Sequence, residues 1–216
     1  QIEIVAINTS GSMESSGWAT LLKYDSVYRT FKKEVKTAEP QGAREIGSLL
    51  IDGHLYPLLA EKEPIKIPWF AYKPDVVIES TGVFRKAEEA ESHLKAGAPK
   101  VIISAPPSPS AGGDGIPIFL MGVNEKNYKG EKIISNGSCT TNCVAPIVKL
   151  IKEKFGIEQA ALTTIHAYTS DQELVDGSHK DLRRARAAAQ NIIPTETGAA
   201  ESVIAIFPDL KGKFAG

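Results

Sequence analysis

The sequence predicts an α/β fold, in which short buried strands form a parallel sheet that helices cover on both faces. Four short apolar runs, three of them rich in β-branched residues, have the composition of such strands: residues 4–7, 76–79, 101–104 and 118–121. A helix is expected over residues 86–96, closed by Gly97, between the second and third runs. This strand–helix–strand order favours parallel strands joined by right-handed crossovers.

The pattern of expected elements changes near Cys139, which predicts a domain boundary there. Residues 108–115 have the composition of a loop, and residues 132–136 form an extended segment that leads into a helix over residues 139–155. Gly156 ends this helix, and Pro146 inside it predicts a kink or a broken hydrogen bond. A strand over residues 161–166 and a long polar loop over residues 168–187 follow. We therefore expect two domains, residues 1–138 and 139–216.

Composition narrows the class of protein. The 216 residues are 42% hydrophobic and 24% charged, as in globular proteins that bury a sizeable core, and the formal net charge is −1. This balance predicts neither nucleic acid nor a membrane as a partner. No apolar run approaches the ~20 residues that cross a bilayer, and no secretory signal is visible.

Two cysteines, four residues apart, are too few for a disulfide framework or a four-ligand zinc site. This predicts a reducing compartment and no metal centre. The chain starts directly on an apolar run after Gln1 and stops at Gly216 without a closing element, so we expect a piece of a longer protein.

The most informative segment surrounds Cys139, which stands at the start of the helix expected over residues 139–155. The positive end of the helix dipole and unpaired backbone N–H groups favour the thiolate, the reactive form of cysteine. The neighbouring hydroxyls of Ser138, Thr140 and Thr141 are suited to capping the helix or holding an anion. A half-buried cysteine beside ordinary cap residues is the alternative interpretation.

A reactive thiol needs a base, and an anionic substrate needs positive groups. Of the four histidines, His166 stands at the end of an expected strand, where a core histidine is an equal alternative to a catalytic base. Thr140, residues 195–198 and the basic run 180–186 are candidate anion sites. For the basic run alone, a solvated helix face is the favoured interpretation.

Seven segments, in order, resemble the phosphorylating glyceraldehyde-3-phosphate dehydrogenase family across essentially the whole chain. They are residues 22–26, 67–69, 79–84, 138–143, 166–169, 181–189 and 191–200. The resemblance implies an incomplete Rossmann-type parallel-sheet domain that binds NAD or NADP, followed by the start of an α+β catalytic domain. The Gly-rich turn with which the family's cofactor domain begins is missing from residues 1–216.

The resemblance also implies an activity, the oxidative phosphorylation of glyceraldehyde 3-phosphate to 1,3-bisphosphoglycerate. Cys139 matches the nucleophile, which forms a thiohemiacetal and then a thioester, and His166 matches the residue that activates the thiol. Cys143 matches a second, structural cysteine. Substrate and inorganic phosphate are implied to bind at Ser138, Thr140, Thr169, Arg184, Thr197 and Gly198.

For the cofactor, the resemblance implies contacts at Thr9, Lys62, Thr81, Gly82, Ser104 and Ser178. Thr9 stands where NAD-preferring enzymes place an acidic residue on the adenosine ribose. The small pair Gly177-Ser178 resembles that of NADP-accepting members, so we predict an NADP-permissive enzyme. An ordinary turn at the end of a strand is the alternative interpretation of Thr81-Gly82.

Two alternatives to this activity remain. The resemblance also implies an oligomeric state and a cellular location. The same scaffold serves erythrose-4-phosphate dehydrogenase, and a 216-residue piece on its own is the alternative of a catalytically incompetent fragment. The family implies a homotetramer, in which the loop over residues 168–187 packs between subunits. It also implies a cytoplasmic enzyme of glycolysis and glucose metabolism, with a plastid location as the alternative.

Overall fold

The computed structural model describes residues 2–108 and 115–216, which divide into two compact units. The first is built mainly from residues up to Ile103 and the second mainly from residues 135–216. The loop expected over residues 108–115 lies almost wholly outside the described residues.

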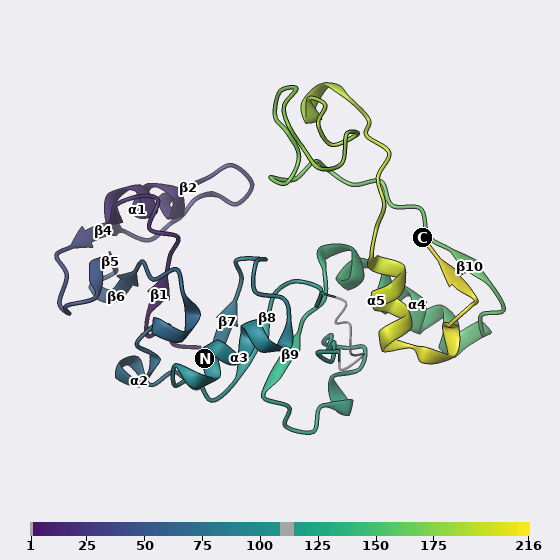
Figure 1. Ribbon diagram of the computed structural model, residues 1–216, viewed down its shortest axis with the longest axis horizontal. Helices are drawn as coiled ribbons and strands as arrows, with labels where there is room; N and C mark the ends of the chain where they lie inside the picture. Colours follow the sequence, from purple (N-terminus) through teal and green to yellow (C-terminus); the bar gives the residue numbers. More distant parts are fainter. Residues whose placement is uncertain (1, 109–114) are drawn as a thin grey trace. The chain divides into compact units, whose positions relative to one another are not determined.

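The first unit contains a four-stranded sheet in the order β1-β6-β5-β4. The strands are β1 (Ile7–Asn8), β4 (Val35–Ala38), β5 (Glu45–Ile51) and β6 (His54–Leu59). β1 runs parallel to β6, whereas β4, β5 and β6 form an antiparallel meander. Helix α1 (Ser15–Lys23) packs Ala19 against Leu49 and Leu58 of this sheet, and a small hairpin of β2 (Tyr24–Asp25) and β3 (Arg29–Thr30) follows it (Figure 1).

A second sheet has the order β7-β8-β9. Its strands β7 (Val77–Glu79) and β8 (Val101–Ile103) are parallel, with α3 (Ala87–Lys95) between them in the chain, and β9 (Ile133–Ser135) follows on the other side of β8. The predicted strand–helix–strand unit is therefore confirmed. The turn η1 (Pro64–Lys66) and the short helix α2 (Trp69–Tyr72) precede β7, and Ile67, Trp69 and Val77 share a small core.

Three expectations about strands were wrong. The first strand covers only Ile7–Asn8, which pair with Leu58 and Leu59 of β6, and Ile4 is 52% exposed. Ile78 of β7 is 59% exposed, so this part of the sheet is not covered on both faces. The run 118–121 makes one isolated bridge, from Ile118 to Ser135. There the Asn124 amide occupies the backbone groups that would extend a strand: it accepts from the Leu120 N–H and donates to the Ile118 carbonyl, both at 2.8 Å.

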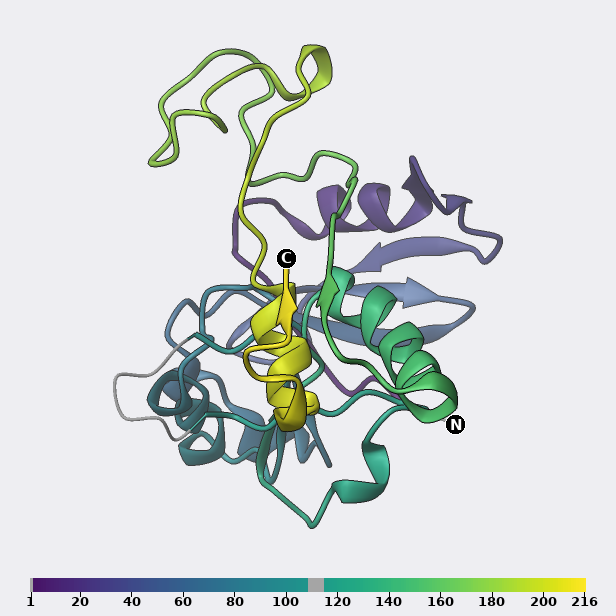
Figure 2. The same ribbon diagram turned by 90° about the vertical axis from the view of Figure 1, so that its right-hand side faces the viewer.

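The second unit centres on two helices, α4 (Cys139–Phe155) and α5 (Ala199–Ile206), which pack side by side (Figure 2). The predicted helix over residues 139–155 is confirmed, and Gly156, at φ +73°, ends it. Pro146 lies within α4 and has no N–H for the helix ladder. Single turns complete the described structure: η2 (Glu125–Asn127), η3 (Ala188–Gln190) and η4 (Pro208–Leu210).

The strand expected over residues 161–166 was also wrong. Only β10 (Ala160–Ala161) forms, paired in parallel with β11 (Phe214–Ala215), and Ile165 beyond it is 99% exposed. His166 therefore stands on an irregular segment. The described residues 168–187 contain neither helix nor strand, as predicted for a long loop.

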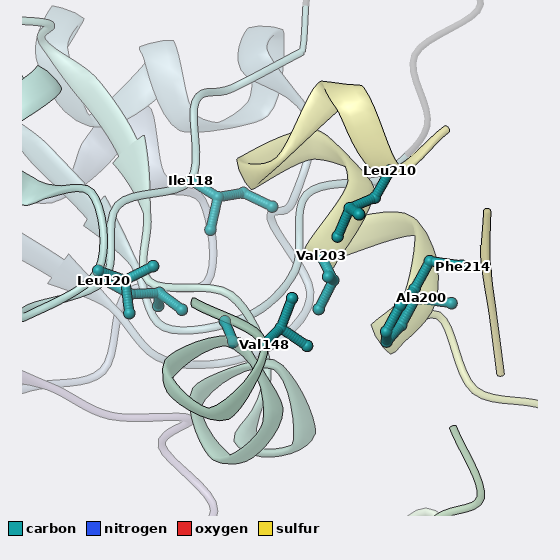
Figure 3. Close-up of a cluster of buried hydrophobic side chains, with 9 residues drawn as sticks. Ile118, Leu120, Val148, Ala200, Val203, Leu210 and Phe214 are labelled. Carbon is teal, nitrogen blue, oxygen red and sulfur yellow. The ribbon is translucent and has the colours of Figure 1, made fainter. Parts of the chain in front are cut away.

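The core of the second unit lies between α4, α5 and the segment around Ile118 and Leu120 (Figure 3). Val148 of α4 and Val203 of α5 point toward one another in this cluster. Its buried members are Ile118, Leu120, Val123, Ala145, Val148, Ala200, Val203, Leu210 and Phe214. This packing holds α4, whose first residue is Cys139, in place.

Within the described ranges, the longest helix is too short and too polar to cross a bilayer. The same ranges contain no group of three or more histidine, cysteine or acidic side chains arranged to hold a metal ion.

Candidate active site

Cys139 is the first residue of α4, directly after a tight turn that follows β9. Gly137 takes a φ of +66° in this turn, a backbone conformation that favours glycine. The hydroxyl of Ser138 accepts from the Thr141 backbone N–H at 3.0 Å and so caps the helix. The Asn142 side-chain amide donates to the carbonyls of Asn136, at 2.7 Å, and Ser138, at 2.9 Å. The backbone around Cys139 is thereby held from both sides.

The structure brings Cys139 and His166 together. The cysteine Sγ lies 3.4 Å from His166 Nε2, and His166 Nδ1 lies 2.6 Å from the Ala167 carbonyl oxygen. Because a carbonyl only accepts, Nδ1 carries a proton and donates it. Nε2 is therefore the ring atom that exchanges a proton with the thiol.

Both groups are shifted toward an ion pair. The hydrogen bond from His166 lowers the pKa of the Cys139 thiol; burial opposes this, and hydrogen bonds from Thr140 add to the lowering. The Ala167 carbonyl, followed by the Cys139 sulfur, raises the pKa of His166. A thiolate beside an imidazolium is the arrangement that attacks electrophilic carbon.

Cys139 and His166 line a cavity of about 750 Å³ in the second unit. Four predicted phosphate-binding residues also line it, namely Thr140, Thr169, Arg184 and Thr197. Ser138 and Gly198 are not among its lining residues; Ser138 caps α4, and Gly198 precedes α5 with open space where a Cβ would stand. Thr197 lies at the same helix start, where its hydroxyl accepts from the Ala199 N–H at 3.2 Å.

Asp171 is a cavity residue that the sequence analysis missed. Its carboxylate accepts from the Thr169 hydroxyl and forms an ion pair with Arg184, whose Nε donates to the Thr195 hydroxyl at 3.0 Å. The Thr169 hydrogen bond lowers the pKa of Asp171, and Arg184 adds to this. A carboxylate two residues after Thr169 in a turn was the signal available in the sequence.

The basic run 180–186 is a turn in the structure, so the solvated helix face that the sequence favoured was wrong. Arg183 pairs with Asp181 at 3.0 Å and Arg186 pairs with Asp176 at 2.8 Å. Of the three arginines in the run, Arg184 is the one that lines the cavity. Cys143 lies one helical turn after Cys139, and both thiols are free and exposed.

The predicted cofactor residues are divided between the two units. Thr9 directly follows β1, and its hydroxyl donates to the Leu59 carbonyl at 2.9 Å and accepts from the Gly11 N–H at 3.2 Å. Thr81 and Gly82 follow β7, and Lys62 is exposed. Ser104, after β8, and Ser178, in the long loop, are exposed residues of the second unit.

A cavity of about 400 Å³ lies just beyond Thr9, and the sequence analysis did not predict its lining. The lining residues are Gly11, Ser12, Met13, Glu14, Ile46 and Ala60. The cavity stands after a parallel strand and before α1, the position at which α/β sheets hold ligands.

These observations describe an α/β protein with a parallel-sheet unit and a second unit that carries a cysteine–histidine pair in a polar, hydroxyl-lined cavity, which Arg184 also lines. Two family models match it: the glyceraldehyde 3-phosphate dehydrogenase NAD binding domain over residues 1–87, and the C-terminal domain of the same enzyme over residues 138–216. The chain belongs to the glyceraldehyde-3-phosphate dehydrogenase family. The match over residues 1–87 supports NAD or NADP as the cofactor class.

Curated relatives match this chain over its whole length. The chloroplastic glyceraldehyde-3-phosphate dehydrogenase GAPB of Arabidopsis thaliana is 48% identical over 217 residues, which cover 100% of this chain and 46% of the relative. Glyceraldehyde-3-phosphate dehydrogenase 2 of Streptomyces avermitilis is 50% identical, and its namesake of Bacillus subtilis is 46% identical, with 61% and 60% of those relatives covered. The chain thus spans about half the length of the relatives it matches.

Proposed function

We propose that this chain is part of an NAD(P)-dependent dehydrogenase that oxidises and phosphorylates glyceraldehyde 3-phosphate. The observation that carries the proposal is the 3.4 Å contact between Cys139 Sγ and His166 Nε2, in a cavity that Arg184 also lines. Membership of the family supports the substrate, because the matched models bear its name.

The proposed chemistry begins at Cys139. Its thiolate attacks the aldehyde carbon, a C–S bond forms, and the carbonyl electron pair moves to the oxygen, which takes the proton from His166 Nε2–H and becomes the thiohemiacetal hydroxyl. His166 then takes the hydroxyl proton as the C–H hydride leaves, and the product is a thioester on Cys139. NAD(P), when bound, accepts that hydride. Inorganic phosphate attacks the thioester carbon, the C–S bond breaks, and Cys139 leaves as a thiolate.

The phosphate groups are proposed to bind at the polar wall of the same cavity. The Arg184 guanidinium, the Thr197 hydroxyl and the backbone N–H groups at the start of α5 are the donors available. Thr140 and Thr169 line the same wall, with their hydroxyl protons donated to Cys139 and Asp171 in this structure. Ser138 and Gly198 belong to this proposal through their helix starts, since neither lines the cavity.

We propose an NADP-permissive cofactor site. Thr9 brings no negative charge to the end of β1, and its hydroxyl is already held by Leu59 and Gly11. A 2′-phosphate there meets no repulsion from this side chain. Ser178, exposed and preceded by Gly177, is the second supporting residue. Comparing kcat/KM for both cofactors tests this; a preference for NAD above about a hundredfold, roughly 2.7 kcal/mol, overturns it.

The assembly, the division of domains and the cellular location are proposals as well. We propose domains at residues 1–138 and 139–216. We also propose a homotetramer, and contacts between its subunits are supported by three exposed apolar side chains of the long loop: Leu174, Val175 and Leu182. Light scattering of the full-length protein tests the tetramer. A cytoplasmic role in glycolysis and a plastid location are both compatible with relatives that include bacterial and chloroplastic enzymes.

The decisive experiment measures NAD(P)H production by the full-length protein with glyceraldehyde 3-phosphate and inorganic phosphate. Cys139→Ser should abolish it, whereas Cys143→Ser should leave it largely intact. Faster turnover of erythrose 4-phosphate favours the alternative dehydrogenase. The 216-residue chain on its own is expected to be inactive, and robust cofactor reduction by it contradicts that expectation.

A further inference from the structure

The first unit contains a buried chain of hydrogen bonds that ends on a carboxylate. Glu79, the last residue of β7, is 4% exposed and His93 of α3 is 3% exposed. Glu79 Oε2 lies 3.0 Å from His93 Nε2, and the Trp69 indole N–H donates to His93 Nδ1 at 3.2 Å. Because indole nitrogen only donates, Nδ1 accepts, and the histidine proton sits on Nε2, pointing at Glu79.

The other carboxylate oxygen organises the turn after β7. Glu79 Oε1 accepts from the Thr81 backbone N–H at 2.8 Å and also from the Thr81 hydroxyl. That hydroxyl in turn accepts from the Val83 N–H at 3.1 Å. The single proton of the Thr81 hydroxyl is therefore already donated inside the protein. This side chain builds the turn and has no proton left for a ligand.

Gly82, at the tip of the turn, is the part left open. Its φ is +74°, and a Cβ built there meets no atom within 4 Å. The turn stands at the carboxyl end of a parallel strand, the edge at which α/β sheets bind ligands. A bare, outward-facing backbone at this edge suits the close approach of a flat ligand.

The buried carboxylate is ionised despite its surroundings. Burial raises the pKa of Glu79, but the hydrogen bonds from His93 and Thr81 outweigh it and bring the pKa below its ordinary value. A buried ionised side chain usually stabilises a protein less than apolar residues of similar volume would. Both carboxylate oxygens of Glu79 accept hydrogen bonds, and we explain this carboxylate by the geometry that it gives the Thr81 turn.

Resting on the NAD(P)-dependent function proposed above, we propose that Glu79 is a positioning residue for the cofactor. Trp69 and His93 orient its carboxylate, the carboxylate holds the Thr81 turn, and the turn presents the Gly82 backbone as a wall of the cofactor site. Thr81 acts in this scheme through the turn and does not bind the cofactor through its hydroxyl.

The test compares Glu79→Gln with wild type in the full-length protein, by steady-state kinetics and by calorimetric titration with NAD and NADP. Gln keeps the shape but turns an N–H donor toward Thr81 or His93. We expect the KM and Kd of the cofactor to rise about tenfold, with kcat within threefold and the KM of glyceraldehyde 3-phosphate unchanged. Glu91→Gln on the exposed face of α3 is the charge-matched control, and it should change neither cofactor constant.

A second pair of variants guards against misfolding of Glu79→Gln. Thr81→Val removes the hydroxyl and should raise the cofactor KM severalfold, and Thr81→Ser should rescue it. The proposal is overturned if folded Glu79→Gln or Thr81→Val keeps a cofactor KM within twofold of wild type while the melting temperature falls. Wild-type protein that binds NAD(P) without oxidising glyceraldehyde 3-phosphate refutes the proposed function and leaves the positioning role to be judged by the calorimetry.

Discussion

Replacing His166 with Asn tests the electrostatic basis of the site most directly. The shorter amide does not reach the position of Nε2, 3.4 Å from Cys139 Sγ, so the thiolate loses its main hydrogen-bond donor. The thiol pKa should rise toward that of an ordinary cysteine. The dipole of α4 and the hydrogen bonds from Thr140 stay in place and keep part of the effect.

The size of the effect follows from exposure. A hydrogen bond to a charged group contributes about 1.5–3 kcal/mol in proteins, and screening at an open site such as this one reduces it to about 1 kcal/mol. Below the thiol pKa, that corresponds to a roughly fivefold smaller thiolate fraction. A more basic thiolate is also the better nucleophile, so the alkylation rate should fall only about two- to threefold. Dehydrogenase turnover should fall much further, about 10²–10⁴-fold, since proton transfer is lost as well.

The assay uses a Cys143→Ser background, which leaves Cys139 as the one thiol of this chain. Ultraviolet thiolate absorbance and the rate of iodoacetamide alkylation are followed against pH, with and without His166→Asn. Titration midpoints that coincide in the two proteins would refute the reasoning, because the imidazole would then contribute nothing to the acidity of the thiol.

Three further predictions rest on single side chains. The pKa of Glu79 is lowered in the folded state, so this carboxylate stabilises the fold above its unfolded pKa, and the stabilisation is lost as the pH falls through the folded pKa. In Glu79→Gln, the free energy of unfolding, measured with urea, should therefore decrease less steeply below about pH 4 than in wild type. Leu120→Ala should lower the free energy of unfolding by about 2–5 kcal/mol, because Leu120 is 1% exposed in the core of the second unit. Asp171→Asn removes the charge that pairs with Arg184 and should tighten binding of inorganic phosphate about fivefold, measured by calorimetry.

Each of these has a matched control. Glu91→Gln should leave the acid limb of the stability curve unchanged, since that carboxylate is exposed. Val27→Ala, at a side chain 79% exposed, should change stability by less than about 0.5 kcal/mol. Asp209→Asn should not alter phosphate binding, because neither Asp209 nor its partner Lys152 lines the cavity. Phosphate binding that weakens in Asp171→Asn would indicate that the carboxylate orients Arg184 instead of competing for it.

Capping and turn residues in the sequence predicted the bounds of one helix closely, but one hairpin was missed although its turn residues are present in the sequence. Helix α4 begins at Cys139 and ends at Phe155 as expected, because a capping serine precedes it and a glycine follows it. The hairpin of β5 and β6 was missed although Asp52-Gly53, both at positive φ, is the turn pair that two-residue hairpins favour. That dipeptide between two apolar runs was legible in the sequence.

Other differences had no local signal. The segment ending at His166 is apolar enough for a strand, yet only Ala160 and Ala161, at its start, pair with β11. The run beginning at Ile118 makes a single bridge because the Asn124 side chain bonds to the backbone of Ile118 and Leu120. Glu79 looks like an ordinary acidic residue in the sequence, because its partner His93 lies 14 positions further along the chain, on α3.

The family, the α/β class, the helix that starts at Cys139 and the candidate residues of the site could all be predicted from the amino-acid sequence, because capping, periodicity and motifs act over a few neighbouring positions. Which side chains meet depends on the folded chain. The 3.4 Å contact of Cys139 with His166 joins residues 27 positions apart, and the Glu79–His93 pair joins a strand to a helix. Such contacts depend on how packed elements set backbone positions, and that information is spread over the whole core.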